Sequence, residues 1–556
     1  MPEKTLGATL RLSQKQLEEV KSKYEDRDYD IARYVNPRRE LLKDSQRFDD
    51  RGYARGKQSY SGVPNSALSV WVDGMQGHMV SSSLNWFRAV MDNAELNEND
   101  EVQMWLQKYT TAMYGVFEDS NFYSILGEWF RDAGSIGTAT LFTEEDIGKG
   151  VAVHIPIHPR EIFIAEDKYG NVDTVHRKFF LTARQAADKF DEEKLSKSVI
   201  ENAKNHPQKM HEFIHAVFPN TDRQYESLLS INKPWASVYL ETNKDRDTKE
   251  DGVVQRSGFD LNPYAVWRLR KNSDEIYGYS AAADAMVEIK KAHQMSRTLL
   301  EAGHMAVRPP LNIPEHMRGN TEIRPDGHNY YEKGGDKASV INTGINYPIA
   351  IDREEKTQRI IEDAYRVEFF LILARAEREM TATEIMERQA EKSVLLGPQV
   401  DRLEREGLAK VFDIVSDIAD KNDKLPEPPQ IVQDFGNEIK IKFTGPLAQA
   451  QRRLFQMQPI KNGLNELAMA STVFPKVLER VNQDRLAERI LDATDFPQDV
   501  MNTDAEMKAI RDQQEAELQQ AQAQAQAQAM ADSIPKLQKK TEEGSPLEAI
   551  GAELGV

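Results

Sequence analysis

The chain contains no cysteine among its 556 residues. Disulfide bonds and thiolate metal sites are therefore excluded, and no cysteine nucleophile is available for catalysis. No stretch approaches the roughly 20 consecutive apolar residues that a membrane-spanning helix requires, and the mean hydropathy is −0.63. The first residues, MPEKTLGATLRLSQ, lack the apolar segment of a secretory signal. We therefore expect a protein without membrane contact that is made and assembled in a cytoplasm.

Basic residues are also scarce, because 72 lysines and arginines face 90 acidic residues and leave a net charge of −18. Stable binding to duplex DNA depends on basic side chains that neutralise phosphates and release counterions. The composition therefore argues against a tight DNA binder, although an acidic wall can surround DNA without holding it. An equally simple explanation is that the negative charge keeps the protein soluble.

Most enzyme motifs are missing. There is no P-loop and no G-x-S-x-G turn, and the glycine pair at 134–137 is too short for a dinucleotide-binding loop. One motif is present, because His211, Glu212 and His215 match the H-E-x-x-H pattern of zinc proteases. That chemistry requires a helix, whereas KMHEFIHAVFP alternates like a strand, and Phe218 stands where the extended motif has glycine. We therefore reject a zinc site and expect no catalysis.

His154 and His158 form a second possible metal pair, because alternate residues share one face of a strand. No third ligand is evident, so structural histidines are the more common explanation. The sequence thus predicts neither a metal nor a cofactor.

The periodicity indicates an α+β fold that is predominantly helical. A helix is expected over 13–40, with Ser13 as N-cap and Pro37 as its end. Further helices are expected at 67–82 and, as two segments, at 98–134. Residues 135–270 consist of short alternating strands, interrupted by a helix at 182–204.

Two long helices follow, one from Gly278 to about Val307 and one from about Asp352. Between them, residues 311–350 are rich in Gly, Pro and Asn and are expected to form a small lobe, with strands at ASVINTG and NYPIAI. The next helix is interrupted at Gly397-Pro398. Residues 446–495 are helical, and the Gln/Ala-rich tail has strong helix formers but little apolar face.

The order of four segments resembles the portal family of tailed phages, in particular the head-to-tail connectors of T7-like podoviruses. They are Ile31–Arg39 with its Tyr-x-x-Pro-Arg-like motif, Leu84–Phe87, and Gly278–Ser280 with the Arg308-Pro-Pro310 end of the long helix. The fourth is Met380–Ile385, followed by Arg388, Leu396-Gly397-Pro398, Arg402-Leu403 and Glu406. The resemblance covers roughly residues 10 to 500 and leaves out the Gln/Ala tail.

The resemblance implies a ring subunit with a wing, a pair of stem helices, a β-containing clip and a helical crown. It implies a wing at 1–277, stem helices at 278–307 and 352–372, a clip at 308–351, a tunnel loop at 373–382, a kinked wing helix at 383–424, a returning strand at 425–445, a crown at 446–505 and a tail at 506–556 that could form a barrel.

It further implies a dodecamer at the unique capsid vertex of a virion assembled in the host cytoplasm. The ring would be a conduit for packaging and ejection of double-stranded DNA, bound without sequence specificity. Its expected partners are the terminase large subunit, tail adaptor proteins, the major capsid protein and the scaffold. The DNA-facing candidates in the tunnel loop are Arg375, Glu377, Arg378 and Glu379, and the partner-contact candidates in the clip are Arg318, Arg324, Lys333 and Lys337.

Simpler roles stay open for these residues: Arg375 and Arg378 could instead pair with the neighbouring glutamates, and the clip charges could form a solvated surface. Two alternative functions also remain, another structural adaptor between head and tail or, less plausibly, an H-E-x-x-H metalloprotease.

Overall fold

The computed structural model falls into two compact units. One contains residues 1–89, 108–427 and 441–495, and the other contains residues 90–107, 428–440 and 496–556. In the described part of the chain, no helix is both long and apolar enough to cross a membrane. The structure describes residues 5–39, 59–93, 95–224, 227, 229–242, 252–324, 326–341, 347–371, 394–435, 439–445, 457–471, 480–493, 502 and 504–538.

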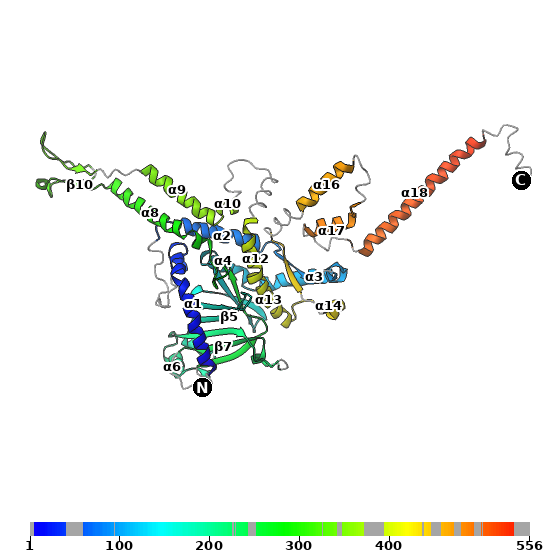
Figure 1. Cartoon of the computed structure of the whole chain (residues 1–556), viewed down its shortest axis with the longest axis horizontal. Helices are drawn as coiled ribbons and strands as arrows, with labels where there is room; N and C mark the ends of the chain where they lie inside the picture. Colours follow the sequence, from blue (N-terminus) through cyan, green and yellow to red (C-terminus); the bar gives the residue numbers. More distant parts are fainter. Residues whose placement is uncertain are drawn as a thin grey trace, which may run out of the picture. The chain divides into compact units, whose positions relative to one another are not determined.

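Two antiparallel sheets form the centre of the first unit (Figure 1). We refer to residues 138–268, which contain these sheets, as the β module. The five-stranded sheet has the order β4-β5-β6-β7-β8, and the three-stranded sheet has the order β3-β2-β9. The strands are β2 (Thr138–Asp146), β3 (Val151–Ile157), β4 (Ile162–Glu166), β5 (Val172–Thr182), β6 (Met210–Pro219), β7 (Trp235–Glu241), β8 (Val253–Phe259) and β9 (Tyr264–Arg268).

Alternation along β6 explains the layering. Ile214 and Ala216 face helix α1 (Leu6–Tyr34), where they pack in a cluster with Leu10. Val217 points to the opposite face, where it shares a core with Tyr264 of the three-stranded sheet. Because successive side chains of a strand point to opposite faces, Ile214 and Val217 serve different layers. Phe213, on the face of Val217, packs in a separate cluster with Ala186 and Val199.

The β module also contains two helices, α5 (Ala183–Lys189) and α6 (Lys197–Asn205). The sequence predicted a single helix at 182–204, and the structure instead begins two helices at separate caps. The side chain of Thr182 accepts a hydrogen bond from Gln185 N, and that of Ser196 accepts one from Val199 N. Each capping side chain accepts a hydrogen bond from a backbone N–H of the first helical turn. The chain therefore begins one helix after Thr182 and a second helix after Ser196.

Helix α1 begins earlier than predicted. Thr5 has extended backbone angles, and its side chain accepts a hydrogen bond from Ala8 N. Ser13 therefore lies inside the helix, and the prediction that it caps the helix is wrong. Leu10, in the turns before Ser13, is buried against the five-stranded sheet, and this packing extends the helix toward the N-terminus.

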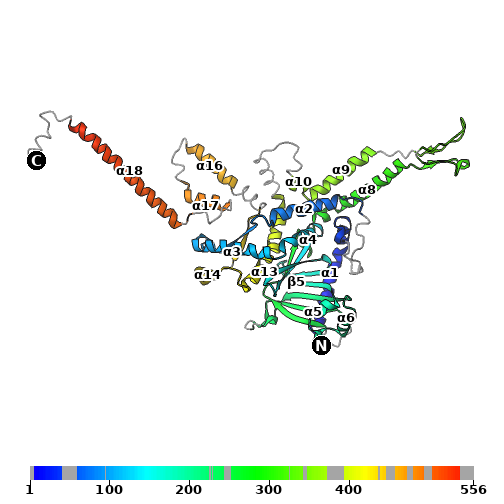
Figure 2. The ribbon, with the colours of Figure 1, turned by 180° about the vertical axis from the view of Figure 1, so that it is seen from behind.

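Three further helices are α2 (Val63–Met79), α3 (Asp100–Asp119) and α4 (Phe122–Ser135), and α4 packs against β2 and β3. The prediction of two helices within 98–134 is confirmed. Gly134 of α4 packs so closely on Trp71 of α2 that a Cβ there would lie 2.6 Å from the indole ring. Helices α2 and α4 lie side by side (Figure 2).

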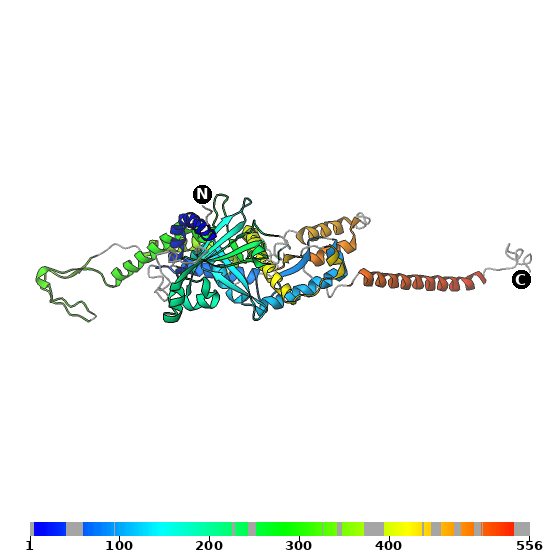
Figure 3. The same cartoon turned by 90° about the horizontal axis from the view of Figure 1, so that it is seen from below.

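A helical hairpin extends from the same unit (Figures 1 and 3). Its arms are α8 (Met286–Val307) and α9 (Tyr347–Ala364), which lie against each other. The short helix α7 (Ala281–Asp284) precedes α8, and α10 (Val367–Phe370) follows α9. Residues 308–341 form the tip, in which β10 (Leu311–Asn312) pairs with β11 (Ser339–Val340).

The strand predicted at NYPIAI is wrong, because residues 347–350 form the first turn of α9. Proline is tolerated in a first helical turn, since the missing N–H has no intrahelical partner there. The remaining described elements are α12 (Gly397–Arg402), a π-helical turn (Leu403–Leu408), α13 (Ala409–Lys421), α14 (Gln430–Phe435), α16 (Gln458–Ser471), α17 (Gln483–Ala493), α18 (Asp504–Gln538) and the strand pair β1 (Phe87–Met91) with β12 (Ile439–Phe443).

Candidate functional site

The segment Ile31–Arg39 anchors the base of the hairpin to α4. Arg39 donates to both carboxylate oxygens of Asp132, at 2.7 and 2.9 Å, and to Glu128 at 2.5 Å. Burial raises the pKa of Asp132 to about 6, against the opposing effect of the Arg39 guanidinium. Asn36 adds a hydrogen bond of 3.2 Å to Ser135. Arg39 is therefore a partly buried structural anchor, whereas the neighbouring Arg38 is exposed.

His293 fixes helix α8 to the same base. Its Nδ1 accepts hydrogen bonds from Tyr60 N at 3.0 Å and Ser61 N at 3.1 Å. Its Nε2 is then free to donate to the carbonyl oxygen of Tyr34, 3.0 Å away. One accepting and one donating nitrogen define a neutral imidazole, and burial lowers the pKa of His293 accordingly. A single side chain thus joins α8, α1 and the segment before α2.

Gly278 and Gly137 allow the backbone before α8 to lie directly on the start of β2. Gly137 has φ +96°, and a Cβ there would lie 2.4 Å from the backbone of Tyr279. Gly278 N donates to the Thr138 hydroxyl at 2.8 Å, and Arg27 donates to Gly278 O at 3.1 Å. Only glycine combines this positive φ with such close approach. The Gly278–Ser280 motif is therefore explained by backbone packing at the root of the hairpin.

Arg268 is the central buried cation of this region, with 2% of its side chain exposed. It forms ion pairs with Glu166 and, at 2.8 Å, with Glu406 of the π-helical turn. It also donates to the carbonyl oxygen of Gly170 at 3.0 Å. Glu406 lies in the fourth family-like segment, but Arg268 had no recognisable signal in the sequence. The structure thus assigns Glu406 a partner that lies 138 positions away in the chain.

The segment Leu84–Phe87 forms the centre of an aromatic cluster. Trp86 and Phe87 are both 1% exposed, and the Trp86 ring lies 5.7 Å from Phe117 and 6.2 Å from Phe122. The Trp86 indole donates a hydrogen bond to the hydroxyl of Tyr123 at 3.2 Å. Aromatic rings at such distances gain from edge-to-face and offset contacts. This motif therefore stabilises the fold.

The arms of the hairpin, in contrast, leave much of their apolar surface uncovered. In α8, the buried residues are Ile289, Ala292 and His293. Farther along α8, Ser296 donates a hydrogen bond to Glu354 of α9 at 2.6 Å. The large apolar residues exposed on the two arms are Val287, Leu300, Met305, Val307, Ile351 and Ile360.

The tip has no core of its own. None of the described residues between 308 and 341 is buried, and Tyr330 is 86% exposed. Within this lobe, Arg324 pairs with Glu322 at 3.0 Å, and both side chains remain exposed. All four partner-contact candidates are exposed: Arg318, Arg324, Lys333 and Lys337.

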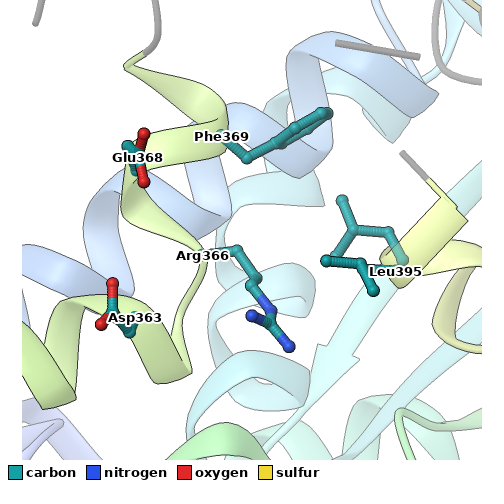
Figure 4. A pocket seen from close by; sticks show the side chains of 6 residues that line it. Asp363, Arg366, Glu368, Phe369 and Leu395 are labelled. Carbon is teal, nitrogen blue, oxygen red and sulfur yellow. The ribbon is translucent and has the colours of Figure 1, made fainter. Parts of the chain in front are cut away.

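A small cavity lies where α9 ends and α10 begins (Figure 4). Its volume is about 90 Å³, and it is lined by Asp363, Arg366, Glu368, Phe369, Leu395 and Leu396. Ligand sites for small molecules usually enclose roughly 300–1,000 Å³. This cavity therefore cannot hold a substrate of ordinary size. The DNA-facing candidates Arg375, Glu377, Arg378 and Glu379 lie outside the described residues.

The H-E-x-x-H motif lies on strand β6, as predicted. Glu212 points away from the two histidines and approaches Lys178 at 3.6 Å. His211 contacts Asn202 at 3.3 Å, whereas His215 contacts Tyr264 and Ser237. Four residues of strand separate the histidines by about 13 Å, too far for one zinc ion.

The His154–His158 pair is also explained by structural contacts. The Nδ1 of His154 lies 2.9 Å from the Thr143 hydroxyl, and that of His158 accepts from Arg160 N at 3.2 Å. Throughout the described ranges, no group of three His, Asp or Glu side chains could hold a metal ion.

These features define an α+β structural protein in which a rigid body carries a long, incompletely covered helical hairpin. A family model described as "Bacteriophage head to tail connecting protein" matches residues 8–501, and the chain belongs to this family. The resemblance and the α+β fold predicted from the sequence are confirmed, as is the prediction that the protein is not an enzyme. A connecting protein of this kind is a component of the phage particle.

Two relatives match over nearly the whole chain. The "Probable portal protein" of Bordetella phage BPP-1 is 27% identical over 521 residues, which cover 91% of each chain. The "Portal protein" of Salmonella phage epsilon15 is 26% identical over 551 residues, which cover 97% of each chain.

Proposed function

We propose that this protein is the portal of a short-tailed phage. Twelve copies form a ring at the unique capsid vertex, and double-stranded DNA passes through the ring during packaging and ejection. The terminase large subunit docks on the ring first and tail adaptor proteins dock later, while the major capsid protein and the scaffold surround it. The observation that carries the proposal is the match of a head-to-tail connector family over residues 8–501.

The hairpin supports the assembly of several copies. A side chain such as Val307, with 82% of its surface exposed, gains on the order of 1.5–3 kcal/mol when it is fully buried. Six large apolar side chains are exposed on the two arms, and neighbouring hairpins in a ring would cover them. A head-to-tail interface of this kind closes into a ring when the rotation between subunits allows it.

The tip supports the same conclusion from a different property. A lobe without buried residues has no apolar burial to offset the conformational entropy lost on ordering. Its two-residue strands Leu311–Asn312 and Ser339–Val340 are too short to be stable alone. We infer that neighbouring copies and docking partners complete the tip, and that Arg318, Arg324, Lys333 and Lys337 contribute contacts to those partners.

The ring is passive in this mechanism. It supplies shape and charge, and an ATPase elsewhere supplies the work. The net charge of −18 keeps DNA from adhering to the channel. Arg375 and Arg378 touch phosphates transiently as DNA passes. Particles with Arg375→Ala and Arg378→Ala that package and retain full genomes normally would show that this contact is not needed.

The first test is the native mass of the purified chain, combined with negative-stain images. Twelve copies of 63.4 kDa give a particle of about 760 kDa with a central hole. A stable monomer, under conditions in which portals assemble, would contradict the proposal.

The contribution of the clip charges has its own test. In assembled rings, reversal of the charges at Arg318, Arg324, Lys333 and Lys337 is expected to weaken binding of terminase and adaptor. Unchanged binding of both partners would assign these side chains to a solvated surface instead.

A further inference from the structure

Four histidines in the described part of the β module are buried, at positions 154, 176, 211 and 215, and two of them, His215 and His176, connect layers. His215 of β6 is 1% exposed. Its Nδ1 lies 2.7 Å from the hydroxyl of Tyr264, on the three-stranded sheet, and its Nε2 lies 3.0 Å from the hydroxyl of Ser237. The ring stacks on Tyr239 at a centroid distance of 4.0 Å. His215 is therefore a polar link between the two sheets, in addition to the ion pair of Arg268 with Glu166.

His176 makes the equivalent link on the other face of the five-stranded sheet. It is 1% exposed, and its Nδ1 lies 3.0 Å from the side-chain oxygen of Gln14 on α1. The amide of Gln14 donates in turn to Glu18 at 3.0 Å. A third buried histidine, His154 of β3, is also 1% exposed. Each boundary of the five-stranded sheet is thus bridged by a buried imidazole.

The surroundings of His215 disfavour a positive charge. The positive charges of Lys189 on α5 and Arg177 on β5 both lower the pKa of His215, and His176 lowers it further when its own ring is charged. The strands β7 and β9 present the neutral side chains of Tyr239 and Tyr264. The negative charge of Glu144 on β2 favours the protonated forms of Lys189, Tyr239 and Tyr264.

Protonation of His215 need not remove a hydrogen bond, because both hydroxyl partners can rotate to accept. The cost is instead the burial of a charge that has no carboxylate within hydrogen-bond distance among the contacts described for His215. For His176, the nearest acceptor is a neutral amide oxygen. Both histidines are therefore accommodated in the folded module only as neutral rings.

We propose that His176 and His215 make the β module an acid-sensitive joint, so that protonation of their rings opens the boundaries between α1, the five-stranded sheet and the three-stranded sheet. The opening is local to these layers, and the chain as a whole need not unfold. This inference uses only contacts within the β module and is independent of the portal function.

The direction of the pH effect follows from the pKa values. Burial lowers the pKa of His176 to about 4 and that of His154 to about 3, from an ordinary value near 6.5, and it lowers the pKa of His215 strongly. The open state therefore binds more protons than the folded state below pH 6.5. Each of these histidines raises the opening equilibrium constant by up to about tenfold per pH unit, until the pH reaches its folded pKa.

The direct test is hydrogen–deuterium exchange at the imidazole C2 position in the unmodified, full-length protein, followed by mass spectrometry from pH 4.5 to 8. The exposed residue His206, on the same module, serves as internal reference. His176 and His215 should show midpoints well below the ordinary imidazole value of about 6.5. Midpoints near 6.5 for both buried histidines would overturn the proposal without any substitution.

The second test measures backbone amide exchange in peptides of β5 and β6, corrected for the intrinsic rate at each pH. In the wild type, the logarithm of the opening constant should rise as the pH falls from 6 to 4.5, by up to about one per pH unit for each histidine that is exposed on opening. His215→Gln and His176→Gln should each reduce that slope by about one, and His206→Gln should leave it unchanged. A slope that stays at the wild-type value in both buried-site variants would refute the role of these rings. If one of the two variants does not fold, the slope measured in the other variant still tests the proposal.

Discussion

The β module and the α8–α9 hairpin use apolar side chains in opposite ways. In the β module, Trp267, Phe213 and Ile164 are fully buried, and two sheets and a helix cover one another. In the hairpin, Val287 and Val307 are more than 70% exposed in the single chain. The first region covers its apolar side chains within one subunit, whereas the second leaves apolar side chains exposed that the proposed ring would cover.

The largest effect on stability is expected from Arg268→Ala. The substitution removes the buried guanidinium that pairs with Glu166 and Glu406, while Lys271 and Arg402 still pair with these two glutamates. The lost charge-assisted hydrogen bonds cost about 3–4 kcal/mol together. Urea unfolding followed by tryptophan fluorescence measures the loss. A decrease below about 1 kcal/mol would show that the pair is not needed to hold the π-helical turn on β9.

A somewhat smaller loss is expected from Gly137→Ala. A Cβ at φ +96° would lie 2.4 Å from Tyr279, and such strain costs on the order of 1–3 kcal/mol. The matched control is Gly77→Ala on helix α2, where nothing lies within 4 Å and alanine should stabilise by up to about 1 kcal/mol. Equal effects of the two changes would remove the argument for close backbone packing at the root of the hairpin.

A substitution on the exposed face of α9 is expected to affect assembly without affecting stability. Ile360→Lys, on the exposed face of α9, should change the unfolding free energy by less than about 0.5 kcal/mol and yet prevent ring formation. Native mass spectrometry measures the assembly. Ile147→Lys, at an exposed turn of the β module, serves as control and should leave the ring intact. Rings that form normally with Ile360→Lys would place the subunit contacts elsewhere.

The smallest effect is expected from Arg297→Ala on α8. Its ion pair with Glu301 spans 3.0 Å, but both side chains are more than half exposed. Exposed pairs of this spacing contribute about 0.3–0.5 kcal/mol, and salt screens them. The urea midpoint should therefore hardly move, in contrast to Arg268→Ala.

Local periodicity predicted the type of most elements but not their boundaries. The alternation of KMHEFIHAVFP correctly indicated a strand and thereby removed the zinc site. The residue type of Ser13 suits an N-cap, yet Thr5 starts the helix because Leu10 packs on a sheet distant in sequence. The short apolar run NYPIAI predicts a strand, yet α9 begins at Tyr347, because periodicity in so short a run does not separate strand from helix.

The position of the lobe between the two long helices could be predicted from the sequence, but the contacts of individual residues could not. The sequence placed a lobe between two long helices and named Arg318, Arg324, Lys333 and Lys337, which are all exposed. It also singled out Arg39 and Glu406 as parts of motifs, but not their partners Asp132 and Arg268. Those partners lie about a hundred positions away or more, and a single sequence contains no record of such contacts.

The absence of disulfides, the α+β character, the long helical arms and the order of the family-like segments can all be predicted from the sequence. They follow from composition and from short-range periodicity. In contrast, tertiary packing alone reveals that Asn36, Trp86 and Gly278 hold the body together and that His176 and His215 lie at layer boundaries. The reason is physical, because burial and the resulting charge state depend on which distant segments meet.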